Sequence, residues 1–206
     1  MPGRLILETT PEKLASFLRA GAEGVANEAP RRNIAPGQEV VVCPPDRMLA
    51  LMRWGMIPVG RVNARGRPVM ETIVNARSET VFAKSAFADV RRCLVPADGW
   101  YEWTGAARRK VAWRIGRKDG RPLAFAAISD TWVAPGGRDL RQVATLTCAP
   151  NADVAPIHDR MGVLLEPEDF SLWLEGDEAE AADLMKPYPD GLLEVREAGD
   201  VDWTAR

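Results

Sequence analysis

The residue in this sequence with the clearest acid–base chemistry is Glu102, which stands in the run Trp100-Tyr101-Glu102-Trp103. Apolar surroundings disfavour the charged form of a carboxylate, so such a group tends to hold a proton near neutral pH. A glutamate held in that state can act as a general acid or a general base. The other interpretation is a surface glutamate on an edge strand whose neighbours happen to be aromatic.

Three more polar groups interrupt the apolar pattern at the ends of strand-like runs or in loops, where functional side chains tend to lie. They are Asn75 with Arg77, His158 with Arg160, and the amino end of the chain. Each has an ordinary structural explanation: Asn75 as the cap of a turn, Arg77 as a surface partner of a glutamate, and His158 as a hydrogen-bonded loop residue. Together with Glu102 they would supply an acid–base pair, an amide and a cationic anchor.

Most of the secondary structure expected to position these groups is β-strand, because strand-like runs separated by turn residues recur along the chain. The runs are apolar or β-branched and lie at 5–7, 39–43, 48–54, 93–95, 111–115, 123–129 and 142–148. Helices are expected from Pro11, over about 80–92, from 170 to 174 and over 178–185, and a turn is expected at 96–99. Most strands follow one another in hairpin order. The sequence therefore predicts an α+β fold with a mostly antiparallel, curved or barrel-like β-sheet core and a few flanking helices.

The distribution of charge divides the chain, although its net charge is only −2. Residues 1–160 carry 24 Lys and Arg against 16 Asp and Glu, whereas residues 161–206 carry 3 against 13. The first part is basic and rich in arginine, which suits the recognition of phosphates and bases; the alternative is a set of solvated surface arginines. The acidic segment from about residue 161 is expected to be helical, and it either closes the fold or mimics DNA charge against the basic surface.

The 206 residues suggest one domain spanning 1–206, and a hydrophobic content of 46% is enough for a substantial core. No apolar run is long enough to cross a bilayer and no signal peptide is visible, so we expect a cytoplasmic protein. Cys43, Cys93 and Cys148 lie in separate strand-like runs and are expected to be buried thiols. The single histidine excludes a multi-histidine metal site, and we expect no metal, no cofactor and a monomer.

Six short segments stand in order between residues 3 and 161 and carry a resemblance to a known family. They are Gly3-Arg4, Asn33 to Pro36, Trp54 to Pro58, Asn75 to Glu79, Cys93 to Gly99 with Tyr101 to Trp103, and Ala155 to Met161. Together they resemble the SOS-response-associated peptidase family, also called abasic-site processing proteins. Six ordered motifs are a specific match, and the resemblance implies that family's fold and a place on the nucleoid when bound to DNA.

The resemblance implies a protein that recognises abasic sites in single-stranded DNA without a cofactor. In that family the initiator methionine is removed, and the amine and thiol of an N-terminal cysteine close a stable thiazolidine on the ring-opened sugar. Carried over, Asn75 would position residue 2 or the opened sugar, Glu102 would act as general acid and base, and His158 would assist proton transfer or reversal. The implied DNA contacts are Arg77 and Arg160 on the flanking phosphates and Arg4, Asn33 and Trp54 along the groove, with Trp54 offering a face for base stacking.

This chain departs from the family pattern at residue 2, which is Pro2 and not cysteine, so neither a thiazolidine nor cysteine-peptidase chemistry can use that residue. If Met1 is removed, the secondary amine of Pro2 can condense with the aldehyde to an iminium, which can lose a sugar proton to Glu102 or His158 and eliminate the 3′ phosphate. We therefore expect an abasic-site lyase or a transient adduct. The alternative is a protein that binds single-stranded DNA or the lesion without catalysis.

A second departure from the family pattern is Gly162, which stands where a proline is more usual after the Ala155 to Met161 motif. We expect this glycine to loosen the loop that contains the motif.

Overall fold

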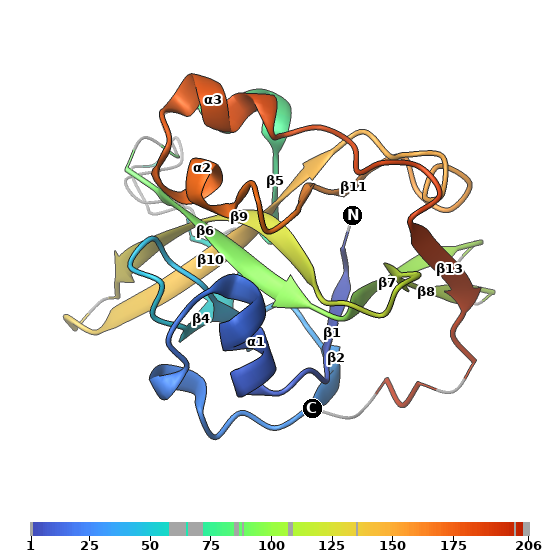
Figure 1. The fold of residues 1–206 in the computed structure, drawn as a ribbon, viewed down its shortest axis with the longest axis horizontal. Helices are drawn as coiled ribbons and strands as arrows, with labels where there is room; N and C mark the ends of the chain where they lie inside the picture. Colours follow the sequence, from blue (N-terminus) through green and yellow to red (C-terminus); the bar gives the residue numbers. More distant parts are fainter. Residues whose placement is uncertain are drawn as a thin grey trace.

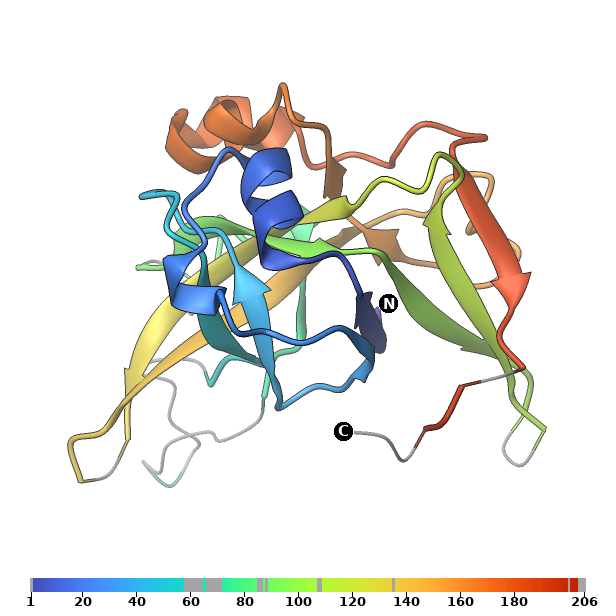
Figure 2. The same cartoon turned by 60° about the horizontal axis from the view of Figure 1, so that its bottom comes forward.

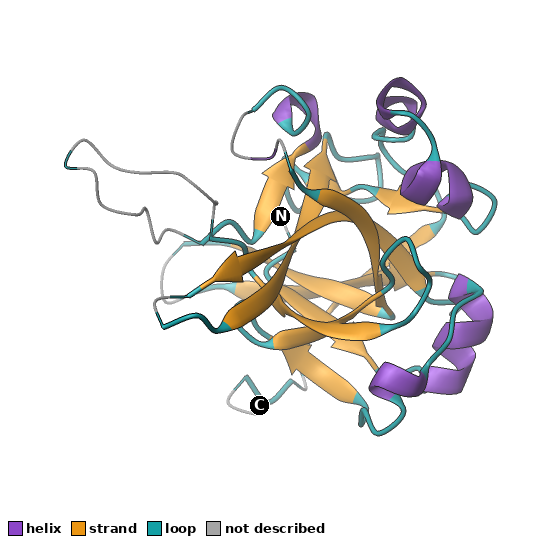
Figure 3. Ribbon diagram, turned by 90° about the vertical axis from the view of Figure 1, so that its left-hand side faces the viewer, coloured by secondary structure: helices purple, strands orange, loops and turns teal. Residues whose placement is uncertain are grey.

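Two curved β-sheets form the body of the molecule and contain most of its core (Figure 1). The computed structural model describes residues 2–57, 65, 72–84, 87, 89–106, 109–134, 136–199 and 201–203. In the view of Figure 3 the strands of the two sheets curve around a common centre, as in a barrel. The predicted α+β fold with a mostly antiparallel, barrel-like core is confirmed.

The first sheet is entirely antiparallel and has five strands in the order β13-β8-β7-β1-β2. Its strands are β1 Arg4–Leu7, β2 Arg31–Ile34, β7 Gly99–Thr104, β8 Val111–Arg117 and β13 Leu193–Glu197. The strand that begins the chain, β1, therefore has a neighbour on each edge. This pairing fixes where the residues just before β1 can lie.

The second sheet is mixed, and the long strands β9 Leu123–Val133 and β10 Asp139–Cys148 form its centre. β9 also pairs with β6 Arg91–Ala97 and β12 Leu164–Leu165, and β10 pairs with β11 Met161–Gly162, all antiparallel. β4 Ala50–Trp54 and β5 Asn75–Arg77 run parallel to β10 along the edge that β9 leaves open, and β3 Glu39–Val42 pairs with β4. The parallel pairing brings Asn75 and Arg77 to the middle of the sheet.

Strands β6 and β7 are one nearly continuous ribbon that passes from the second sheet into the first. The single residue between them, Asp98, is bent, and its carboxylate accepts hydrogen bonds from the backbone N–H and the hydroxyl of Thr9 at 2.7 and 2.6 Å. Gly99 follows because a Cβ there would stand 2.5 Å from the carbonyl oxygen of Ile115 on β8. The turn predicted at 96–99 is therefore wrong: Pro96 lies within β6, and the chain changes sheets without reversing.

Short helices lie on the outside of the sheets: α1 Pro11–Leu18, α2 Phe170–Glu175 and α3 Glu178–Asp183. Figure 2 shows α1 (blue) beside α2 and α3 (orange) on one side of the molecule. There the rings of Phe17 and Phe170 meet edge to face with their centroids 5.5 Å apart. Proline at the first position of α1 and a capping box between Asp177 and Glu180 account for where α1 and α3 begin.

The helix expected over about 80–92 is wrong. The described residues of that segment form a short 3₁₀ helix, Ser78–Thr80, followed by turns, and Arg91 and Arg92 already belong to β6. A second 3₁₀ helix lies at Glu23–Val25.

The acidic carboxyl-terminal segment from residue 161 is only partly helical, which corrects the expectation of a helical segment. It supplies β11, β12 and β13 as well as α2 and α3, so it closes both sheets. No helix in the described part of the chain combines the length and the apolar character that spanning a membrane would require.

Candidate active site at the amino end of the chain

The start of the chain is held by a side chain from the second sheet. Asn75 lies opposite Thr145 in the parallel pairing of β5 and β10. The Thr145 hydroxyl donates to the amide oxygen of Asn75 at 2.5 Å, and the amide nitrogen of Asn75 donates to the carbonyl oxygen of Pro2 at 3.1 Å. Because Thr145 is fully buried, the amide is held in this orientation. Asn75 therefore holds residue 2 and does not cap a turn.

Glu102 lies on β7 with only 3% of its surface exposed. Side chains alternate between the faces of a strand, so Glu102 shares its face with Trp100 and with Trp113, its direct neighbour on β8. Burial raises the pKa of the Glu102 carboxyl to about 7; the positive charge of the amino terminus lowers this pKa, and the negative charge of Asp159 raises it. Glu102 is therefore a buried carboxyl that titrates near neutral pH, and it is not an exposed residue of an edge strand.

The aromatic rings next to Glu102 in the sequence, Trp100, Tyr101 and Trp103, do not all surround it in the structure. Tyr101 and Trp103 alternate with Glu102 and project from the other face of β7. There they meet Trp203, with ring centroids 5.0 and 5.3 Å away. On the Glu102 face, the Trp100 ring packs edge to face against Phe125 at 5.6 Å.

Gly162 makes room for the Phe125 ring. A Cβ at position 162 would stand 2.3 Å from Cε1 of Phe125. Gly162 is buried in β11 and is paired with Thr147 of β10. The expectation that this glycine loosens the loop is therefore wrong, because an aromatic ring that supports Trp100 fills the space a side chain would take.

His158 is half-buried in the segment between β10 and β11. Its Nδ1 accepts a hydrogen bond from the backbone N–H of Arg160 at 2.9 Å, and the carboxylate of Asp159 stands 2.8 Å from the same nitrogen. Burial lowers the pKa of His158, as does the positive charge of the amino terminus, while Asp159 raises it. The lowered pKa favours the neutral ring at pH 7, and the hydrogen bond from the Arg160 N–H assigns the proton of that ring to Nε2. The backbone N–H of Gly3 donates to the carbonyl oxygen of Tyr101 at 3.5 Å, so the described start of the chain runs beside Glu102 on β7.

Arg160 is engaged by protein groups. Its guanidinium forms a two-pronged ion pair with Glu79, at 2.5 and 2.9 Å, and donates to the carbonyl oxygen of Thr147 at 2.5 Å. The hydrogen bond from Arg160 lowers the pKa of Glu79 to about 2. Arg160 therefore fixes the His158 segment to β10. A role on DNA phosphates would require it to leave or share Glu79.

Arg77 is exposed at the end of β5. The partner suggested for it, Glu79, pairs with Arg160, and no carboxylate of the described residues lies within 4.0 Å of the Arg77 guanidinium. Arg77 lies two residues from Asn75 on the same strand, so both side chains leave β5 on the same face. Arg77 therefore projects from β5 on the same side as the Asn75 side chain that holds Pro2.

Arg4 and Asn33 lie away from this group. Arg4 is directly opposite Tyr101 in the pairing of β1 and β7, so it leaves the sheet on the face opposite to Glu102. Its guanidinium donates to Oδ1 of Asn33 at 2.6 Å, and Nδ2 of Asn33 donates to the carbonyl oxygen of Asp202 at 3.0 Å. These two residues join β1 to the carboxyl-terminal segment.

Trp54 does not offer a face to bases, and that expectation is wrong. It is fully buried at the end of β4, where it lies opposite Val143 of β10. Its indole N–H has no hydrogen-bond acceptor among the described residues. The ring is part of the core that supports β10.

The three cysteines cannot supply the thiol that residue 2 lacks. All three are free and buried. Burial raises the pKa of Cys43 and Cys148 to about 11 and that of Cys93 to about 12, so none is a thiolate near neutral pH. Within the described residues no group of three or more His, Cys, Asp or Glu side chains is arranged to hold a metal ion.

Thr145, Trp113 and Phe125 belong to the site, although the sequence does not single them out. Each is an ordinary residue inside a predicted strand. Only the pairing of strands far apart in the chain brings them to Asn75, Glu102 and Trp100, so no local signal could have found them.

Known proteins resemble this chain in sequence and in fold. A family model described as SOS response associated peptidase (SRAP) matches residues 1–200. The abasic site processing protein YoqW of Bacillus subtilis (strain 168) is 32% identical over 180 residues, which cover 84% of this chain and 77% of that protein. The abasic site processing protein YoaM of the same organism is 34% identical over 152 residues, covering 70% and 66%. A solved structure from Bacteroides thetaiotaomicron has the same fold, with a TM-score of 0.84 at 21% identity over 96% of this chain and 92% of that one.

Proposed function

This chain belongs to the SOS response associated peptidase family, and we propose that it processes abasic sites in single-stranded DNA through the amine of Pro2. An abasic sugar opens to an aldehyde, and an amine held beside a proton donor is the chemistry that reacts with an aldehyde. The observation that carries the proposal is the hydrogen bond from Asn75 to Pro2. It supports the proposal because it fixes the backbone of residue 2 just before β1, the strand that pairs with the Glu102 strand β7.

The first proposed step is a condensation that requires removal of Met1, which lies outside the described residues. The secondary amine of Pro2 attacks the aldehyde carbon, and protonated Glu102 gives its proton to the carbonyl oxygen. Loss of water, which takes the proton of the amine as well, leaves an iminium cation and an ionised Glu102. A pKa of about 7 lets Glu102 begin protonated and finish ionised near neutral pH.

The second proposed step is elimination. An iminium formed from a secondary amine has no N–H to lose, so it stays charged and acidifies the neighbouring C2′–H bond. Ionised Glu102 takes the C2′ proton, the C3′–O bond breaks, and the 3′ phosphate leaves with its electron pair. His158 keeps its proton on Nε2 because Nδ1 accepts from Arg160, so His158 serves as a hydrogen-bond donor to the sugar or the leaving group. Water then hydrolyses the iminium and frees Pro2.

The DNA contact that the geometry supports best is Arg77. Its guanidinium is exposed on the same strand face as Asn75 and is free of a carboxylate partner within the described residues. A charge-assisted bond from Arg77 to a phosphate next to the lesion would set the register of the strand. Because the lesion has no base, nothing in the site has to read sequence.

The test is a single-stranded oligonucleotide with one abasic site, treated with the protein with and without borohydride. Mass spectrometry of the intact protein first establishes that Met1 is absent. We expect an adduct that depends on borohydride, and strand cleavage without it. Glu102→Gln should slow both by roughly 100-fold, whereas exposed Glu168→Gln should not. A protein lacking Met1 that yields neither adduct nor cleavage would contradict the proposal.

A second candidate is a protein that binds the lesion without reacting, and the lack of a thiol at residue 2 favours it. Pro2 is also buried. In this second candidate the hydrogen bond from Asn75 to Pro2 has a structural role and fixes the shape of the binding site. In the same assay this protein would retain the abasic oligonucleotide on a native gel and give no adduct with borohydride.

A further inference from the structure

A row of cations crosses the outer face of the first sheet. Arg196 of β13 is directly opposite Arg114 of β8, Arg114 is opposite Tyr101 of β7, and Tyr101 is opposite Arg4 of β1. Directly paired residues of antiparallel strands project to the same face. The three arginines and the tyrosine therefore form one line across four strands, on the face opposite to Glu102.

This arrangement costs stability. Like charges directly opposite each other in a sheet repel, and Arg114 and Arg196 are such a pair. Among the described residues, Arg114 pairs with the carboxylate of Glu8 at 3.8 Å, and Glu8 is closer to Arg32, at 2.6 Å. Within the described residues no carboxylate lies within 4.0 Å of the exposed Arg196 guanidinium. The pair thus has positive charge that the protein itself does not neutralise.

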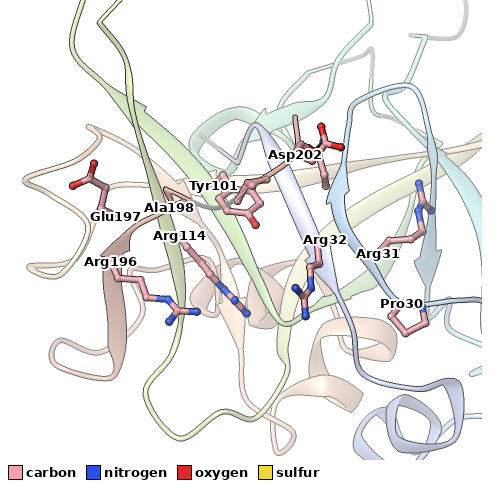
Figure 4. A pocket seen from close by; sticks show the side chains of 11 residues that line it. Pro30, Arg31, Arg32, Tyr101, Arg114, Arg196, Glu197, Ala198 and Asp202 are labelled. Atoms are coloured by element: carbon pink, nitrogen blue, oxygen red, sulfur yellow. Dashed lines mark hydrogen bonds between the residues drawn. The ribbon is translucent and has the colours of Figure 1, made fainter. Parts of the chain in front are cut away.

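The same arginines border two hollows in the surface. One has a volume of about 420 Å³ and is lined by Arg32, Arg114, Arg196 and Tyr101, among others. Figure 4 shows the side chains of Arg196, Arg114 and Arg32 side by side, with their guanidinium groups toward the same opening. The second hollow, of about 440 Å³, shares Arg114 and Arg196 and adds Lys13 and Lys118. Because they share two arginines, the hollows lie next to each other, and we call the two together the groove.

Aromatic rings stand beside this groove. Tyr101, Trp103 and Trp203 form a cluster on the same face of β7, with centroids 5.0 to 6.4 Å apart. A positively charged groove with aromatic rings beside it is the usual arrangement of a site that follows a single nucleic-acid strand without reading its sequence.

We propose that this groove, centred on Arg114 and Arg196, is a second binding site for the phosphodiester backbone of single-stranded DNA. It deepens the proposed function and rests on it: the strand that carries the lesion at Pro2 continues around the sheet onto the outer face. A strand fits this groove better than a free phosphate does, because the cations extend across both hollows. Two neighbouring phosphates would neutralise the opposed arginines together.

The experiment compares unmodified single strands of about 30 and about 6 nucleotides, since a short strand cannot occupy both faces. Fluorescence anisotropy gives both dissociation constants at several salt concentrations. The ratio of the two dissociation constants measures the advantage of the long strand. Arg114→Gln combined with Arg196→Gln should reduce this ratio roughly tenfold. It should also lower the salt slope of long-strand binding by about 1.4, or about 0.7 for each lost phosphate contact. The control is Arg138→Gln with Arg141→Gln, at two exposed positions outside the groove. It removes the same charge and should keep both the long-strand advantage and the salt slope. Arg114→Lys with Arg196→Lys should retain most of the advantage.

The outcomes separate this site from the proposed chemistry. The borohydride trap with wild-type protein and a short abasic strand reports the chemistry alone. If the double glutamine variant binds the long strand with the wild-type advantage and salt slope, the second site is wrong, whatever the trap shows. If the advantage falls but no adduct forms, the groove stands and the Pro2 chemistry fails.

Discussion

Asn75 holds residue 2 through its backbone carbonyl, a group that every amino acid has. The anchor is therefore independent of the side chain at position 2. The proline can change without moving the start of β1, and the chemistry of the site can be altered at that one position.

Pro2→Cys should convert the proposed transient adduct into a durable one. After removal of Met1, an amine and a thiol on the same residue close a five-membered thiazolidine on the aldehyde, which has no iminium left to eliminate. We expect an adduct that survives denaturing electrophoresis without borohydride. Pro2→Ser, which offers a primary amine and no thiol, is the control and should still need borohydride; a durable adduct with serine would show that the thiol is not the cause.

Glu102→Gln should stabilise the protein above pH 7 and have little effect near pH 4. The folded state raises the pKa of Glu102 from 4.5 to about 7, so the protonated acid is favoured, and its contribution to stability is lost as pH rises from about 4.5 to 7. Removing the buried charge should add at most about 3 kcal/mol to the free energy of unfolding at alkaline pH. Urea denaturation at about pH 5 and pH 8.5 measures the difference; an effect that does not grow with pH would contradict the assigned cause.

At the level of the element, the long strands were predictable and the segment 80–92 was not. Phe82, Phe87 and Val90 have a spacing close to that of a helix face, which explains the error. In the structure the centre of the Phe82 ring lies 6.5 Å from that of Trp173 in α2. The segment therefore packs against a helix that is far away in the sequence, and it is not itself a helix. A pattern of burial along the chain does not distinguish these two arrangements.

Strand pairing also decided which candidate residues came together. Asn75 contacts Pro2, and the positive charge of the amino terminus lowers the pKa of both Glu102 and His158. The catalytic roles of these four residues stay predictions. Arg4 lies on the other face, because β1 pairs with β7 in a register that the sequence does not reveal. The β2 and β13 partners of this sheet were not predicted either, since β2 is largely polar and β13 is both polar and largely exposed.

Gly162→Ala should test the packing behind Glu102. The new Cβ would overlap the Phe125 ring and push it against Trp100, at a cost of about 1 to 3 kcal/mol in the free energy of unfolding. Adding Phe125→Leu should restore part of the loss by vacating that space. Gly199→Ala, which meets no atom within 4 Å, should have no measurable effect in the same urea titration; if Gly162→Ala is equally silent, the ring does not need that space.

At the level of the whole molecule, the charge division of the sequence is not a division of the surface. Residues 161–206 contain only 3 basic residues, and one of them, Arg196, is placed by β13 directly opposite Arg114 of the basic part. The acidic segment thus contributes to the cationic groove. Composition alone would have assigned it the opposite role.

The β6–β7 ribbon has a consequence for how the protein melts. One uninterrupted piece of backbone is hydrogen bonded into both sheets, so neither sheet can come apart while the other keeps all of its strands. We expect a single cooperative heat transition, with calorimetric and van't Hoff enthalpies that agree. Two resolved transitions would show that the sheets are thermally independent. A single cooperative transition would mean that heating cannot loosen the amino end of the chain, which continues into β1, while β7 with Glu102 stays folded.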